Sequence, residues 1–153
     1  MKALVVYDSQ FGNTERLARL ITETLIKHMT VRLLAAHEAA AYDLEAVDLL
    51  VLGCPTQKHD ITPDFETVLN SMPPHALEGK ATFVFDTRFR GWKLITGSAA
   101  DHLGKRLEAL GAVLITPPES FFVTGIEGPL EEGEARRAVN WARAMLSELN
   151  VTI

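Results

Sequence analysis

Residues 3–21, ALVVYDSQFGNTERLARLI, decide the fold. Residues 3–7 form a continuous apolar run that includes Val5 and Val6, as in a parallel strand that is covered on both faces. A polar segment follows at residues 8–13, and from Thr14 to about His28 apolar side chains return at helical spacing. The face of this helix contains Leu17, Leu20, Ile21, Thr24 and Leu25. The stretch therefore predicts a strand, a short polar loop and a helix.

The alternation of strand and helix continues to the end of the chain. Apolar runs predict further strands at residues 31–34, 47–52, 81–85 and 112–115. Helical stripes predict helices at residues 63–72, 95–110 and 135–149, whereas the alanine-rich segment 35–41 is ambiguous. Pro63 suits the first position of a helix, and Gly111 suits the position just after one. Pro117-Pro118 interrupts the last strand, and Phe121-Phe122-Val123 either resumes it or forms a flap.

This order of elements indicates an α/β fold. Five strands that alternate with helices predict one doubly wound, five-stranded parallel sheet with helices on both faces. A length of 153 residues leaves room for one domain, so we expect residues 1–153 to form a single unit. Ligands of such sheets bind beyond the carboxyl ends of the strands, where the strand order reverses. The loops after the first, third and fourth strands are therefore the ones in which to look for function.

The composition excludes several classes of protein. A hydrophobic fraction of 47% with 23% charged residues is ordinary for a globular chain and excludes global disorder. The formal net charge of −5 disfavours general nucleic-acid binding. Cys54 is the only cysteine, so an intramolecular disulfide and a multi-cysteine metal site are both impossible.

The hydropathy pattern contains no membrane segment. No stretch approaches the roughly 18 apolar residues of a membrane span. The apolar run near the N-terminus is too short for the core of a signal peptide. We therefore expect a soluble, cytoplasmic protein without a membrane span.

The loop after the first strand has the composition of an anion site. Ser9, Asn13 and Thr14 offer polar side chains, and Gly12 permits positive φ or a close approach of the backbone. The free N–H groups of the helix that follows favour an anion. The alternative is a well-capped helix after a tight turn, because Ser, Asn and Thr are good capping residues. A Walker A loop and a dinucleotide fingerprint are both absent.

Residues 5–21, VVYDSQFGNTERLARLI, resemble the signature of the flavodoxin family. The match covers 17 positions in register with the predicted strand, loop and helix, and the resemblance extends over nearly the whole chain. It implies a flavodoxin-like sheet with the strand order 2-1-3-4-5, of the short-chain branch. It also implies that the cofactor is FMN. The residues that would hold the FMN phosphate are Ser9, Gln10, Phe11, Gly12, Asn13 and Thr14.

The loop after the third strand is similar to the second flavin loop of the family. The resemblance implies cofactor contacts from Pro55, Thr56, Gln57, Lys58 and His59. The family usually carries an aromatic ring here, and His59 is the only ring available, with a solvated loop histidine as the alternative. Cys54 is expected to be a small buried residue rather than a reactive thiol. In the family a peptide of this loop flips to hydrogen-bond the reduced flavin, and a non-glycine residue with positive φ makes such a flip costly. Because residues 55–62 lack a glycine, we expect a weaker neutral semiquinone than in a relative that has one.

The loop after the fourth strand departs further from the family. The resemblance implies cofactor contacts from Asp86, Thr87, Arg88, Phe89, Gly91 and Trp92. Phe89 and Trp92 are candidates for the missing aromatic platform, unless they pack against the following helix. Three cations, Arg88, Arg90 and Lys93, stand where many flavodoxins carry acids. Cations near the flavin would make the potential of its second reduction step less negative, whereas cations on a solvated face would leave that potential unchanged.

Other kinds of site are not indicated. The scattered histidines show no metal-binding spacing, and no nucleophile elbow is present. A response-regulator receiver is excluded because Gly53-Cys54 replaces its phosphoacceptor and Asp8 stands without an acidic neighbour.

Three functions therefore stay open. The first is an FMN-binding electron carrier that shuttles electrons between redox partner proteins, most simply as a monomer. The second is an FMN-dependent oxidoreductase of the quinone reductase type. The third is a flavodoxin-like binding module that has lost FMN.

Overall fold

The computed structural model describes residues 1–56, 60–90 and 98–151. Its centre is a parallel sheet with the strand order β2-β1-β3-β4-β5, which is the order that the resemblance implied. The strands are β1 (Lys2–Tyr7), β2 (Thr30–Ala35), β3 (Leu49–Pro55), β4 (Ala81–Phe89), β5 (Val113–Leu114) and β6 (Glu119–Val123). The chain leaves β1 toward β2 on one side and continues from β3 to β4 on the other, so the strand order reverses between β1 and β3.

The fifth position of the sheet is divided between two strands. β5 pairs with the start of β4, and β6 pairs with its end, both in parallel register. Pro117 and Pro118 lie between them, and proline cannot donate to a ladder of hydrogen bonds. Phe121-Phe122-Val123 therefore resumes the strand and is not a flap.

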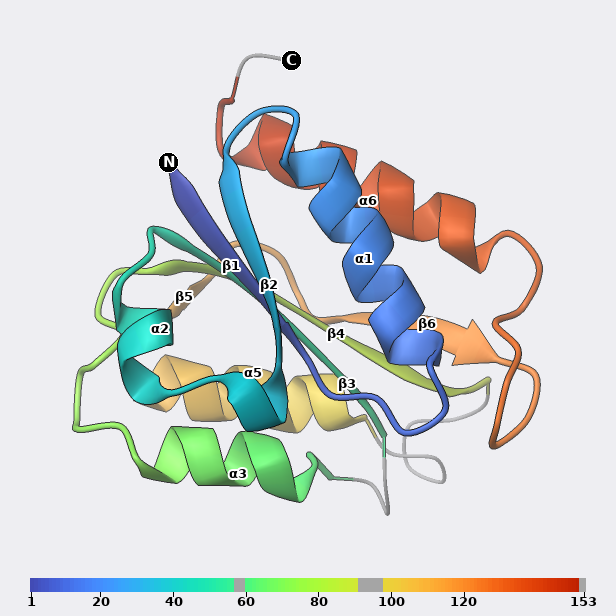
Figure 1. Ribbon diagram of the computed structural model, residues 1–153, viewed down its shortest axis with the longest axis horizontal. Coiled ribbons are helices and arrows are strands. Elements are labelled where there is room, and N and C mark those ends of the chain that lie inside the picture. Colours follow the sequence, from blue (N-terminus) through green and yellow to red (C-terminus); the bar gives the residue numbers. More distant parts are fainter. Residues whose placement is uncertain (57–59, 91–97, 152–153) are drawn as a thin grey trace.

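Helices cover both faces of the sheet, as predicted (Figure 1). α1 (Asn13–Leu25) and α6 (Glu134–Glu148) lie on one face. α2 (Ala41–Glu45), α3 (Pro63–Asn70) and α5 (Ala99–Ala109) lie on the other. Among the described residues, no helix is both long and apolar enough to cross a membrane.

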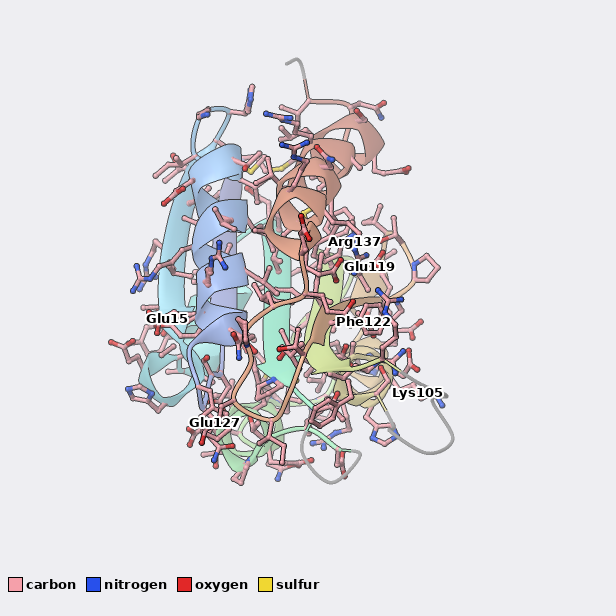
Figure 2. All side chains as sticks on the ribbon, turned by 90° about the vertical axis from the view of Figure 1, so that its right-hand side faces the viewer. Glu15, Lys105, Glu119, Phe122, Glu127 and Arg137 are labelled. Carbon is pink, nitrogen blue, oxygen red and sulfur yellow. The ribbon has the colours of Figure 1, made fainter. Side chains whose placement is uncertain are left out.

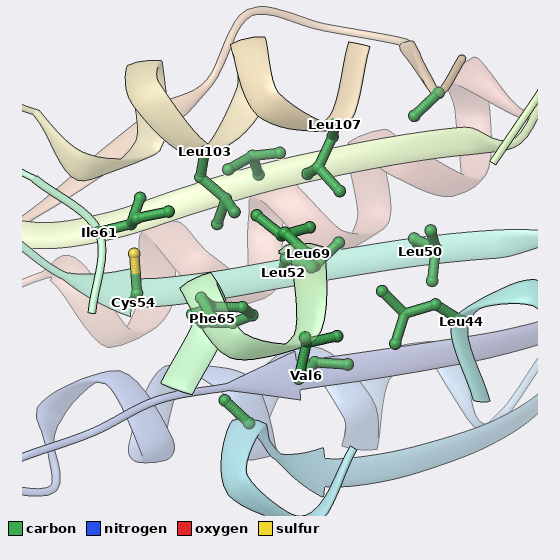
Figure 3. Close-up of a cluster of buried hydrophobic side chains, with 14 of the residues drawn as sticks. Val6, Leu44, Leu50, Leu52, Cys54, Ile61, Phe65, Leu69, Leu103 and Leu107 are labelled. Atoms are coloured by element: carbon green, nitrogen blue, oxygen red, sulfur yellow. The ribbon is translucent and has the colours of Figure 1, made fainter. Parts of the chain in front are cut away.

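The two layers of helices explain why the central strands β1 and β3 carry apolar side chains on both of their faces. Leu4 and Val6 of β1 point toward α3 and α5, whereas Val5 points toward α1 and α6. Figure 3 shows the first of these cores, with Leu52 of β3, Leu69 of α3 and Leu103 of α5 among its side chains. Burial of one such side chain contributes about 1.5–3 kcal/mol before conformational entropy is subtracted.

Most helix boundaries agree with the sequence pattern to within a few residues. Pro63 begins α3, and Gly111 follows α5 with a φ of 97°. α1 ends at Leu25, three residues before the predicted end, and α3 ends before the double proline. The ambiguous segment 35–41 divides into a 3-10 turn, Ala36–Glu38, and the start of α2.

An aromatic cluster fixes the sheet beneath α6. Trp141 is half-buried and meets Phe83, Phe85 and Phe121 edge to face, with ring centroids 5.7–6.1 Å apart. On the neighbouring strand a Cβ at Gly53 would lie 2.1 Å from the Phe85 ring. Glycine is therefore required where β3 passes this ring.

Candidate functional site

A cavity of about 240 Å³ opens at the carboxyl ends of β1, β3 and β4, where the strand order reverses. Four segments far apart in the sequence contribute to it. Its lining consists of Gln10, Phe11, Asn13, Thr14, Pro55, Thr56, Thr87, Arg88, Phe89, Val123 and Ile126. The ends of all three strands that the sequence indicated therefore meet at one place.

The loop after β1 leaves the N-terminus of α1 without a side-chain cap. Gly12 is the N-cap residue, with a φ of 88°, and as a glycine it has no side chain with which to cap the first turn. Ser9 instead accepts a hydrogen bond of 3.0 Å from the N–H of Gly12. The first N–H groups of a helix have no partner inside it, so here they are left for an anion. The structure thus favours the anion site over the well-capped helix.

Hydrogen bonds connect the segments that line the cavity. The hydroxyl of Thr14 lies 2.9 Å from that of Thr87 and joins α1 to β4. The N–H of Thr56 donates to the carbonyl of Thr87 at 2.9 Å and joins the end of β3 to β4. Gln57, Lys58 and His59, and with His59 the ring expected from this loop, lie outside the described residues.

The end of β4 contributes one cation and one aromatic ring. Arg88 lines the cavity, is only 8% exposed, and donates from Nε to the hydroxyl of Ser120 at 3.0 Å. Phe89 also lines the cavity and is 41% exposed. Gly91, Trp92 and Lys93 lie outside the described residues.

Arg90 does not line the cavity. Its guanidinium donates to both carboxylate oxygens of Glu131 and lies 4.2 Å from the centroid of the Phe122 ring. Hydrogen bonding to Glu131 raises the pKa of Arg90. Of the two expected cations that the structure describes, Arg88 alone lies at the cavity.

Three other predicted residues support the cavity without lining it. Ser9 and Gly12 shape the loop after β1, as described above. Asp86 is fully buried and forms hydrogen bonds with the end of β3 and the start of α5.

The end of β6 and the segment that follows it supply lining residues that sequence reasoning missed. Val123 and Ile126 close one side of the cavity. The carbonyl of Glu127 accepts a hydrogen bond of 3.1 Å from Asn13, which holds this segment beside the start of α1 (Figure 2). The return of apolar residues at Phe121-Phe122-Val123, after the double proline, was the available signal. It predicted a strand or a flap but not a wall of the site.

Cys54 lies beside the cavity but is not a reactive group. It is fully buried in β3, and burial raises the pKa of its thiol well above its ordinary value. The negative charge of Asp86 acts in the same direction. In the described parts of the chain, no cluster of His, Cys, Asp or Glu is suited to hold a metal ion.

Comparison with known proteins decides the family. The model of the flavodoxin family matches residues 5–141. The chain belongs to the flavodoxin family. A flavodoxin of Maridesulfovibrio salexigens is 31% identical over 119 residues, which are 74% of this chain and 81% of that protein. Flavodoxins bind FMN, so FMN is the cofactor of this family member, and its function is electron transfer.

Solved structures agree with this assignment. Oxidised flavodoxin 1 of Bacillus cereus superposes with a TM-score of 0.82 at 22% identity, covering 96% of this chain and 98% of that one. Flavodoxin 2 of the same organism gives a TM-score of 0.81 at 26% identity, covering 97% and 99% of the two chains.

The described residues fit FMN. The uncapped N-terminus of α1, together with Ser9 and Thr14, would hold the phosphate through N–H groups and hydroxyls. Pro55, Thr56 and the segment from Thr87 to Phe89 would form the walls around the ring system. No basic side chain is required at the phosphate.

Proposed function

We propose that this flavodoxin family member is a one-electron carrier between redox partner proteins. The observation that carries the proposal is the chemistry of the cavity lining. Among its described residues the only charged side chain is Arg88. Arginine side chains do not serve as general acids or bases near neutral pH. Bound FMN supplies one-electron chemistry, and transfer of an electron requires no general acid or base from the protein.

The rim of the cavity supports contact with protein partners. Phe11, Phe89 and Ile126 are 44%, 41% and 73% exposed and come from three different segments. Grouped apolar side chains on a surface are typical of interaction sites. We propose that partners dock on this rim, so that electrons cross a short distance to the cavity.

The two alternatives have less support. An oxidoreductase that transfers hydride to a quinone also needs a proton source, and the described lining offers none. A binding module without FMN would have no use for the uncapped N-terminus of α1. We further propose that the protein is a cytoplasmic monomer, in keeping with its single free cysteine.

Three measurements on the purified protein test the proposal. A visible spectrum before and after addition of FMN should show about one flavin retained per chain. Reduced protein should pass electrons to a one-electron acceptor such as cytochrome c. The isolated protein should not oxidise NADH or NADPH in the presence of a quinone. Rapid oxidation would identify an oxidoreductase, and a colourless protein that refuses FMN would identify a binding module.

A further inference from the structure

A buried carboxylate lies directly behind the cavity. Asp86 of β4 has no exposed surface, and its Oδ2 atom accepts three hydrogen bonds. The donors are the hydroxyl of Thr56 at 3.1 Å, the hydroxyl of Ser98 at 2.8 Å and the N–H of Ala100 at 3.0 Å. All three partners donate, so the site requires a side chain that only accepts.

These hydrogen bonds determine how the two hydroxyls are oriented. Because Asp86 takes both hydroxyl protons, the lone pairs of the two oxygens are left for the first turn of α5. The hydroxyl of Thr56 accepts from the N–H of Ala99 at 3.1 Å, and that of Ser98 accepts from the N–H of Asp101 at 3.4 Å. Three consecutive N–H groups at the start of α5 are thus satisfied through one carboxylate, whose charge also suits a helix N-terminus.

The network connects the end of β3 to the start of α5. Thr56 directly follows β3, and it lines the cavity. Ser98 is the N-cap residue of α5. Asp86 therefore fixes a lining residue at the end of β3 relative to the N-terminus of α5.

The charge of Asp86 is only partly compensated. Its Oδ1 atom is buried and, within residues 1–56, 60–90 and 98–151, has no hydrogen-bond partner. A carboxylate in a low-dielectric interior repels added negative charge over several ångströms. Electrons placed in the neighbouring cavity would experience this repulsion.

We propose that Asp86 is a positioning residue for FMN binding and that its buried charge lowers the potential of the bound flavin. The proposal rests on the proposed function, since it concerns the same cavity. Asp86 acts through Thr56 and Ser98 and is not itself part of the lining.

The test compares Asp86→Asn with a matched variant, Asp43→Asn. Asp43 is also buried, and it accepts hydrogen bonds from the N–H of Ala40 at 2.9 Å and from Arg32 at 3.2 Å. It lies at the start of α2 and does not line the cavity. For each protein we would measure the FMN-free stability by urea unfolding, the Kd for FMN by fluorescence quenching, and the potential of the flavin's second reduction step.

Both substitutions should reduce stability, because each disturbs a helix start. Asp86→Asn alone should raise the Kd for FMN by about tenfold or more, and it alone should make the potential less negative. If Asp86→Asn does not fold, Ser98→Ala removes one donor from the same network and should raise the Kd several-fold.

Three outcomes would overturn the proposal. In the first, the folded Asp86→Asn variant, or Ser98→Ala in its place, binds FMN as wild type does. In the second, Asp43→Asn changes Kd and potential equally. In the third, the wild-type protein, which is measured first, fails to bind FMN. That result would overturn the proposed function together with this inference.

Discussion

The hydroxyl groups of Thr14 and Thr87 lie 2.9 Å apart and share a hydrogen bond between the first turn of α1 and the end of β4. Both residues are almost fully buried, with exposed fractions of 1% and 5%. Both also line the cavity. One hydrogen bond therefore ties the loop assigned to the phosphate to a wall assigned to the ring system.

Removing both of these hydroxyls should cost less than the sum of the two single removals. In Thr87→Val the buried hydroxyl of Thr14 loses its partner, so we expect a loss of about 1–3 kcal/mol in the free energy of unfolding. The double variant Thr14→Val/Thr87→Val leaves no unpaired group and should lose clearly less than the sum of the single variants. Urea unfolding of the FMN-free proteins measures this coupling, and strictly additive losses would contradict it.

A matched substitution separates stability from binding. Thr82 is a fully buried threonine of the same strand, and its hydroxyl donates to the carbonyl of Lys80 at 3.0 Å. Thr82→Val should alter stability but leave the Kd for FMN unchanged, because Thr82 is not in the cavity lining. Thr87→Val should weaken FMN binding. Equal Kd values for the two variants would count against a role of Thr87 in the site.

Arg88 should make the reduced flavin easier to form. A positive charge near the ring favours an added electron by about 1 kcal/mol or more, which corresponds to about 40 mV in a one-electron step. We therefore expect Arg88→Gln to shift the second reduction potential to more negative values. The control is Arg90→Gln, since Arg90 is paired with Glu131 and does not line the cavity. Potentiometric titrations that show the larger shift for Arg90→Gln would contradict this assignment.

The sequence predicted the architecture because its patterns are local. The runs in β1 and β3 are apolar at every position, and helical stripes follow them, so the layers could be derived before any contact was known. The split of the fifth position was harder to predict. Pro117 and Pro118 indicated an interruption. That the chain pairs with β4 again, from Glu119 opposite Phe85, depends on contacts across the sheet that no local pattern shows.

The site was predictable only where it follows strand ends. Thr14, Thr56 and Thr87 lie close to the carboxyl ends of the three strands that the topology indicated. Ile126 was missed because a loop between a strand and a helix carries no periodic signal of its own. The sequence left open whether Arg90 lies near the flavin or on a solvated face, because its partner Glu131 is 41 residues away. Ion pairs of this kind are not visible in sequence spacing.

The ion pair between Glu134 and Arg137 should make stability depend on pH. Glu134 is almost buried at the start of α6 and accepts from Arg137 at 2.7 Å and from the N–H of Phe122 at 2.8 Å. Burial opposes ionisation, but these hydrogen bonds prevail and hold the pKa of Glu134 below its ordinary value of 4.5. Arg137 also binds Glu119 at 2.8 Å, and Figure 2 shows these two side chains together.

A lowered pKa stabilises the fold above the pKa of the unfolded chain, and this contribution is lost as the pH falls through the folded value. Glu134→Gln should therefore cost about 1–3 kcal/mol near pH 7 and progressively less below about pH 4.5. Urea unfolding at several pH values measures the difference. The exposed Glu132 provides the control, since Glu132→Gln should change stability little at any pH. A Glu134→Gln penalty that stays constant down to about pH 3 would contradict the argument.

Gly53 should be among the positions least tolerant of a methyl group. A Cβ there would lie 2.1–2.5 Å from three carbon atoms of the Phe85 ring. That ring has little room to move, because Phe121 and Trp141 lie with their centroids 5.9 and 5.8 Å away. Gly53→Ala should therefore lose about 1–3 kcal/mol or more in the free energy of unfolding, measured by urea titration.

A second substitution shows whether the Phe85 ring is the cause. Phe85→Leu removes the ring atoms that the new methyl group would meet, so Gly53→Ala/Phe85→Leu should lose less than the sum of the two single changes. Gly125→Ala is the matched control, because its Cβ would meet only the carbonyl of Gly128, at an ordinary 3.6 Å. It should stay within about 0.5 kcal/mol of wild type. Additive losses in the double variant would contradict this, because they would mean that the methyl group at Gly53 disturbs the backbone of β3 and not the Phe85 ring.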